Sequence, residues 1–200
     1  MAEFAYADIA GMIDHSLLQP VLTDAELEHG CLLAREYAVA SVCIKPYAVR
    51  TAAGLLAGST VAVGTTIGFP HGGHATEIKR AEAEQALADG ARELDMVVNI
   101  GKVLSKDWRY VAGDIRAVVD VAHRGQVIVK VIFENCFLQN EHKEELCRIC
   151  GEVNADFVKT STGYGATGAT DEDLRLMRRC APAHVRVKAA GGVRNYDRLL

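Results

Sequence analysis

The sequence contains no apolar run that approaches the roughly 18 residues of a membrane-spanning helix. Its first residues do not combine a basic region with an apolar core, which is the pattern of a secretion signal. The formal net charge is only −4 and the basic residues are scattered, so no electrostatic footprint for nucleic acid or for an acidic membrane is present. We therefore expect a cytoplasmic protein that acts on a small molecule, with no nucleic acid and no membrane as partner.

Disulfide and metal motifs are also missing, although cysteine is not. The cysteines lie in apolar segments, which favours buried, reduced thiols; they are Cys31, Cys43, Cys136, Cys147, Cys150 and Cys180. Cys147 and Cys150 form a lone C-x-x-C in a helical pattern with no second pair. His71 and His74 share a glycine-rich loop without a third ligand nearby. We expect no metal site.

Short runs rich in apolar and β-branched residues recur along the chain, as strands do. They cover residues 12–18, 39–44, 60–67, 93–99, 127–133, a stretch around Lys159, and 185–190. Helical segments are predicted between them, over about 23–37, 48–56, 76–88, 106–122 and 141–153, and from about 170 and 195 onward. Thr23 and Glu26 have the spacing of a capping box, and Thr76 is expected to cap the helix that it begins.

Strict alternation of β and α segments with nearly continuous apolar strands predicts a parallel sheet covered by helices. No G-x-G-x-x-G follows the first strand, which argues against an open dinucleotide-binding sheet. A (β/α)8 TIM barrel fits better, because charged residues of several strands then converge at one end. Only seven strand signals occur in the 200 residues. We therefore expect residues 1–200 to form a single α/β barrel domain, C-terminally incomplete, that lacks the eighth strand and helix and has two open edges.

Three of the strand runs carry a lysine, and these lysines, Lys130, Lys159 and Lys188, are each 29 positions apart. Solubility at a sheet edge could explain one of them, but three in phase indicate a repeated unit with lysines at equivalent places. A lysine amine becomes a nucleophile toward carbonyl groups once its proton is removed, which burial and nearby positive charge favour. Lys159 lies at the centre of the apolar run Phe157–Gly163 and is the leading candidate nucleophile.

Several segments together carry a resemblance to a known family. They are Glu93–Val97, Lys130–Glu134, Phe157–Gly163 and Lys188–Arg194, with Ile13–Leu18, the Cys43 strand and Gly68–Gly72 resembling family segments in the same order. The chain thereby resembles the deoxyribose-phosphate aldolases, which are class I aldolases on a (β/α)8 barrel. The resemblance implies reversible cleavage of 2-deoxy-D-ribose 5-phosphate into D-glyceraldehyde 3-phosphate and acetaldehyde, without a metal or an organic cofactor.

The same resemblance implies individual roles for the charged residues. Lys159 resembles the Schiff-base lysine, Lys188 the second lysine beside it, and Asp95 the acid of the proton relay. We expect the ammonium group of Lys188 to lower the pKa of Lys159, so that free amine is available near neutral pH. Asp14 and Lys130 are expected to tune this network, to hold substrate hydroxyls or to form an ion pair that serves only orientation.

Substrate contacts are expected around the glycine turns that follow two of the strands. Gly163, Gly191 and Gly192 would let backbone amides approach the phosphate where helices begin. Thr160 and Ser161 could bond substrate hydroxyls, and the Cys43 strand is expected to support the charged network. The family also uses a glycine-serine turn after an eighth strand, which this sequence does not contain.

Two other functions stay open at the level of sequence. One is a different Schiff-base aldolase or a sugar-phosphate isomerase on the same barrel. The other is a truncated, non-catalytic barrel fragment, although retention of Asp95, Lys159 and Lys188 favours an enzyme. The oligomeric state is also open, with a homodimer or a higher homo-oligomer both possible.

Overall fold

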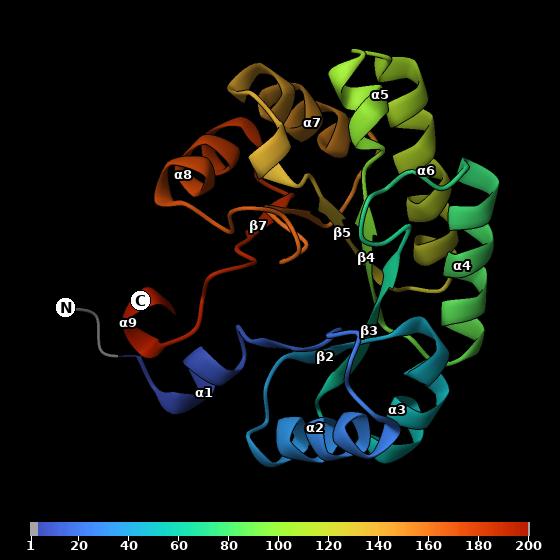
Figure 1. The fold of residues 1–200 in the computed structure, drawn as a ribbon, viewed down its shortest axis with the longest axis vertical. Helices are drawn as coiled ribbons and strands as arrows, with labels where there is room; N and C mark the ends of the chain where they lie inside the picture. The colour runs from blue at the N-terminus through green and yellow to red at the C-terminus, as the bar shows by residue number, and fades with distance from the viewer. Residues whose placement is uncertain (1–3, 200) are drawn as a thin grey trace.

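The computed structural model describes residues 4–199, and its core is one sheet of seven parallel strands in sequence order. The strands are β1 (Asp14–Leu17), β2 (Ser41–Ile44), β3 (Ala62–Ile67), β4 (Glu93–Val97), β5 (Ile128–Ile132), β6 (Phe157–Lys159) and β7 (Arg186–Lys188). The sheet curls, and the helices lie along its outer side (Figure 1). Each strand falls within its predicted run. The predicted class, an α/β barrel with seven strands, is confirmed.

The helices follow the predicted alternation. They are α1 (Tyr6–Ala10), α2 (Asp24–Glu36), α3 (Val49–Leu55), α4 (Thr76–Ala88), α5 (Ile100–Leu104), α6 (Trp108–Arg124), α7 (Asn140–Glu152), α8 (Asp171–Cys180) and α9 (Tyr196–Leu199), with 3-10 turns η1 (Pro46–Ala48) and η2 (Asn135–Phe137). Helices α1 and α5 were not predicted, because five residues are too few to repeat an apolar stripe. Within residues 4–199, no helix combines the length and apolar character needed to cross a membrane.

Two helix starts show where local signals suffice and where they fail. Thr23 and Glu26 form the predicted capping box at α2, in which the Glu26 carboxylate accepts from Thr23 N at 2.7 Å. The prediction that Thr76 caps α4 is wrong, because Ala75 holds the cap position and the Thr76 hydroxyl donates to Asp114 Oδ1 at 2.8 Å. The Thr76 hydroxyl therefore binds the buried Asp114 carboxylate on α6 instead of capping the start of α4.

That carboxylate belongs to a fully buried ion pair in the outer layer. The Lys79 amine on α4 lies 2.6 Å from Asp114 Oδ2 and donates to Val97 O, the last residue of β4, at 2.9 Å. Both side chains are almost completely excluded from solvent. Each charge is therefore compensated inside the protein, and the contact ties α4 and α6 to the end of the strand that carries Asp95.

The first and last strands of the sheet meet through side chains. The Lys188 amine on β7 lies 2.8 Å from Asp14 Oδ1 on β1 and donates to Met12 O at 2.9 Å. Within residues 4–199, β1 and β7 are not paired through their backbones. The sheet thus curls far enough for its two edges to share one ion pair.

Lys79→Met should lower the free energy of unfolding by about 3–5 kcal/mol, because Asp114 would be left buried without its cation. Arg80→Met is the matched control on the same helix, since Arg80 pairs with Glu77 at the surface, and it should change stability by less than about 1 kcal/mol. Urea unfolding of both variants measures the difference. Equal losses for the two would contradict a structural role for the buried pair.

Candidate active site

The three lysines lie on adjacent strands but not in one row. Lys159 pairs in register with Lys188 of β7 and with Ile132 of β5. Lys130 lies two residues before Ile132, opposite Phe157 and Asp95. The expectation of three equivalent places is therefore wrong for Lys130, which sits one pleat deeper in the barrel.

Six charged side chains from five strands form one cluster on the inner side of the curled sheet. Their formal charges balance, because three are lysines and three are carboxylates. The members are Asp14, Glu93, Asp95, Lys130, Lys159 and Lys188. The structure thus brings together both predicted catalytic lysines, the predicted acid and the two charged residues of the predicted supporting network.

The contacts form a chain of alternating charge. The Lys159 amine donates to Asp95 Oδ2, and the other oxygen, Oδ1, lies 3.4 Å from the Lys130 amine. Lys130 continues the chain to Asp14 Oδ2 at 3.0 Å. Asp14 Oδ1 then meets Lys188, as described above. Lys159 and Lys188 are therefore linked through carboxylates rather than placed amine against amine.

This arrangement reverses one electrostatic expectation. Burial is the largest single effect and lowers the pKa of Lys159, but the charge and hydrogen bond of Asp95, together with Cys43, outweigh burial and raise the pKa above its usual value. The prediction that Lys188 lowers this pKa is wrong, because the Lys188 amine lies against Asp14 and Met12 O. A resting Lys159 is therefore an ammonium group in contact with a carboxylate.

The carboxylates stay ionised for the complementary reason. Burial raises the pKa of Asp14, but Lys130 and Lys188 together outweigh burial and bring it down to about 2. Burial is likewise outweighed at Asp95, where Lys159 and Lys130 lower the pKa. Asp14 and Asp95 are therefore held as carboxylates at neutral pH.

Cys43 and Glu93 complete the surroundings of this cluster. Cys43 Sγ lies 3.9 Å from Asp95 Oδ2, and burial raises its pKa to about 12, so the group stays a thiol that donates to the carboxylate. Glu93 contacts the Lys130 amine and was missed as a site residue. Its position two residues before Asp95 places both side chains on one face of β4, and this alternation was the signal available in the sequence.

The glycine turns lie where two loops touch. Gly163, Gly191 and Gly192 all have φ between 78° and 87°, a region that glycine enters freely. Gly168 packs so closely that a Cβ there would lie 2.2 Å from Gly191 O. However, α8 begins only at Asp171 and carries three acids in its first turn, whose negative charge disfavours a phosphate at this N-terminus. Anion binding at these turns would rest on loop amides alone.

The two hydroxyl residues after Lys159 have different surroundings. The Thr160 hydroxyl donates to Ala190 O at 3.1 Å and accepts from Ala190 N at 3.0 Å. It joins the loops after β6 and β7, so the structure does not offer it to a substrate. Ser161 Oγ is buried and has no hydrogen-bond partner among the described residues. Ser161 therefore keeps a free hydroxyl two residues beyond Lys159, at the start of the loop that follows β6.

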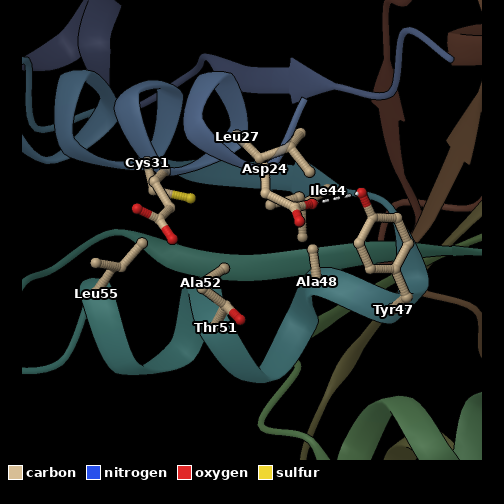
Figure 2. Close-up of a pocket in the computed structure, with 10 residues that line it drawn as sticks. Asp24, Leu27, Cys31, Ile44, Tyr47, Ala48, Thr51, Ala52 and Leu55 are labelled. Carbon is tan, nitrogen blue, oxygen red and sulfur yellow. Dashed lines mark hydrogen bonds between the residues drawn. The ribbon is translucent and has the colours of Figure 1, made fainter. Parts of the chain in front are cut away.

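A cavity of about 200 Å³ lies away from this cluster, between α2 and α3 (Figure 2). Its wall includes Cys31, whose pKa is raised by burial, and its rim includes Tyr47, which donates to Asp24 at 3.1 Å. No lysine lines it. Across residues 4–199, no three His, Cys, Asp or Glu side chains are placed to hold a metal ion. The charged cluster is therefore the candidate active site.

Comparison with known proteins agrees with this geometry. A family profile described as DeoC/LacD family aldolase matches residues 9–200. A deoxyribose-phosphate aldolase of Rhodopirellula baltica is 58% identical over 200 residues, which cover 100% of this chain and 83% of the relative. One of Clostridium perfringens is 49% identical over 189 residues, covering 94% and 84%.

A solved structure shares the fold as well. The tetrameric deoxyribose phosphate aldolase of Aeropyrum pernix superposes with a TM-score of 0.90 at 30% identity, covering 98% of this chain and 82% of that one. Profile, sequence identity and fold agree over nearly the whole chain. The chain belongs to the DeoC/LacD family of aldolases.

Proposed function

We propose that this chain is a deoxyribose-phosphate aldolase that cleaves 2-deoxy-D-ribose 5-phosphate reversibly into D-glyceraldehyde 3-phosphate and acetaldehyde, with Lys159 forming the Schiff base. The observation that carries the proposal is the contact between the buried Lys159 amine and Asp95 at the carboxyl end of β6. An amine that faces a carboxylate has a proton acceptor at hand, and such a pair is what imine formation needs. The activity is the one named for the relatives described above.

The first step is removal of a proton from Lys159. Because Asp95 raises the pKa of this amine, the proton lies on Lys159 in the resting pair. The free amine forms when this proton moves to Asp95 along the existing hydrogen bond. This transfer converts an ammonium–carboxylate pair into a neutral amine and a carboxylic acid. It leaves the net charge of the cluster at zero, which limits its cost inside the barrel.

Attack of the amine on the C1 carbonyl then forms a carbon–nitrogen bond and a carbinolamine. Asp95 returns its proton to the departing hydroxyl, water leaves, and an iminium cation remains beside the regenerated carboxylate. The Asp95 carboxylate, which opposes loss of the proton from the Lys159 ammonium group, therefore also stabilises the iminium cation that forms on the same nitrogen.

Carbon–carbon cleavage uses the iminium as an electron acceptor. The C3 hydroxyl gives up its proton, the C2–C3 bond breaks with its electron pair moving toward nitrogen, and D-glyceraldehyde 3-phosphate leaves an enamine on Lys159. Protonation of the enamine carbon and hydrolysis by water release acetaldehyde and the free amine. We assign these proton transfers to Asp95, with Lys188 and water as partners, and the positioning of the pair to Asp14 and Lys130.

The phosphate end of the substrate is assigned to the glycine turns. An added Cβ would meet nothing within 4 Å at Gly163 or Gly192, so a ligand can approach the backbone there, and loop amides of this kind bind anions. The free hydroxyl of Ser161 is the group we assign to a substrate oxygen. As the Aeropyrum relative is tetrameric, we also propose a homo-oligomer, which sedimentation velocity would test.

Lys159→Leu should reduce cleavage of deoxyribose 5-phosphate by about 10³-fold or more, because the nucleophile is gone. A coupled assay of glyceraldehyde 3-phosphate measures the rate. Lys102→Leu on α5 is the control, since Lys102 pairs with Asp107 outside the cluster, and it should keep the wild-type rate. Wild-type protein that does not cleave this substrate would reject the proposed activity and favour a non-catalytic fragment or another aldolase.

Borohydride added together with acetaldehyde should attach an ethyl group to Lys159, because only the iminium is reduced to a stable amine. Peptide mass spectrometry locates the group. Modification of Lys188 with Lys159 unmodified would reverse the assignment of the nucleophile.

In the plot of imine formation against pH, the acid limb is the loss of imine as Lys159 becomes protonated at low pH. Asp95→Asn should shift this limb to lower pH. The carboxylate that raises the pKa of Lys159 is removed, whereas burial and Lys130, which lower it, remain. Turnover should fall by about 10²–10⁴-fold because the proton relay is lost. The pH dependence of borohydride-trapped imine measures the shift.

Glu93→Gln is the matched control for this experiment. Glu93 is the other acid of β4 and contacts Lys130 instead of Lys159. The acid limb of this variant should stay in place. An acid limb that is unchanged in Asp95→Asn, or displaced to higher pH, would contradict the assigned cause of the raised pKa.

A further inference from the structure

Tyr164 follows Gly163 directly and connects three loops. Its hydroxyl donates to Leu18 O at 2.8 Å, across 146 positions of sequence. Its ring packs edge-on against Phe69, with centroids 5.5 Å apart and planes at 85°. Leu18 follows β1, Phe69 follows β3 and Tyr164 follows β6. One side chain therefore joins the loops that leave three different strands.

These contacts cross the barrel mouth and do not run between neighbours. In the sheet order β3 and β6 are separated by β4 and β5, whereas β1 and β6 are separated on the open side of the curl only by β7, whose Lys188 meets Asp14 of β1. All strands are parallel, so the loops after β1, β3 and β6 leave from the same end, where active sites of this architecture lie. The ring contact from the β6 loop to the β3 loop therefore reaches over the interior of the curl, and the hydrogen bond to Leu18 O crosses the open side between β7 and β1. Residues 162–168, which we call the strap, therefore extend across the mouth.

The other end of the strap is held by Glu134. This residue is buried, has a left-handed backbone with φ of 56°, and received no role from the sequence. Its carboxylate accepts from Thr162 N at 3.3 Å and from the Thr162 hydroxyl. Gly165 lies against it, because a Cβ there would be 3.0 Å from Glu134 Oε1 and 2.6 Å from Cys136 Sγ. The strap thus has one buried anchor at Glu134.

The two anchors differ in strength. Thr162 binds the buried Glu134 side chain through two groups, its amide and its hydroxyl, and hydrogen bonds shielded from water are costly to break because the partners cannot be resolvated. Tyr164 is 42% exposed and uses one neutral hydrogen bond and one ring contact, which water can replace at little cost. The Tyr164 end can therefore open while the Glu134 end stays fixed, with Gly163 between them.

We propose that Tyr164 is a positioning residue that holds the strap across the mouth, so that the Gly163 amide is fixed where the phosphate of the substrate binds. The inference rests on the proposed function and adds to it a residue that determines how the phosphorylated end is recognised. Tyr164 acts through the loop and not on the reacting carbon. Its loss should affect binding of the phosphorylated substrate and leave imine chemistry intact.

Tyr164→Phe tests the hydroxyl contact and Phe69→Leu tests the ring contact. Each should raise KM for deoxyribose 5-phosphate about threefold to tenfold, as expected for one hydrogen bond or aromatic contact, with kcat within about twofold of wild type. Borohydride trapping of acetaldehyde on Lys159 should be unchanged, because acetaldehyde carries no phosphate. Amide hydrogen exchange of residues 162–168 should become faster.

Tyr6→Phe is the matched control. The Tyr6 hydroxyl also donates to a backbone carbonyl, Tyr37 O, at 2.8 Å, but it lies on α1 outside the strap. This variant should keep the KM, kcat and loop exchange of wild type. Its KM rising as in Tyr164→Phe would overturn the inference.

Other outcomes also decide the matter. An unchanged KM in Tyr164→Phe, with active wild-type enzyme, would overturn the inference and leave the proposed function standing. A parallel loss of kcat and of acetaldehyde trapping would show a general structural role and would overturn it too. Wild-type protein that forms no imine with acetaldehyde would instead overturn the proposed function, and the inference with it.

Discussion

Mutual neutralisation of three lysines and three carboxylates is the constraint on which the rest of the structure depends. Each charge alone would cost several kcal/mol to bury, and the cluster becomes tolerable only because the chain Lys159–Asp95–Lys130–Asp14–Lys188 alternates in sign. Five strands must deliver these side chains to one region, at depths that differ by one pleat between Lys130 and Lys159. A curled parallel sheet meets this requirement, since its strands present alternate residues to a common interior.

The same balance of charge bears on the chemistry. A nucleophilic lysine is often described as an amine whose pKa is lowered by a neighbouring cation, but here Asp95 raises the pKa of Lys159. The site is thereby arranged for a cation at this nitrogen, and an iminium is such a cation. Deprotonation of Lys159 costs more in this arrangement, but the proton acceptor already lies in contact, so no separated charge is created inside the barrel.

Contacts outside the charged cluster hold the strands and loops on which its residues lie. The Lys79–Asp114 pair holds the end of β4, two residues beyond Asp95, against α4 and α6. Thr160 ties the loop after β6 to the loop after β7 through Ala190. These contacts fix the elements at the base of the site, whereas Tyr164 at the mouth is held by one hydrogen bond and one ring contact.

The sequence alone determined the alternation of strands and helices and the barrel class, because apolar periodicity is a local property. It also marked Lys159 as a candidate nucleophile inside an apolar run, and the family resemblance added Lys188 and Asp95 as candidate site residues. The tertiary structure decided which charges meet. It set Lys130 one pleat below Lys159 and paired Lys188 with Asp14, which reversed the expected pKa of Lys159. It also gave Glu134 and Tyr164 their contacts. Strand register and the curl of the sheet fix such pairings, and both arise from packing between segments far apart in sequence, which no local pattern records.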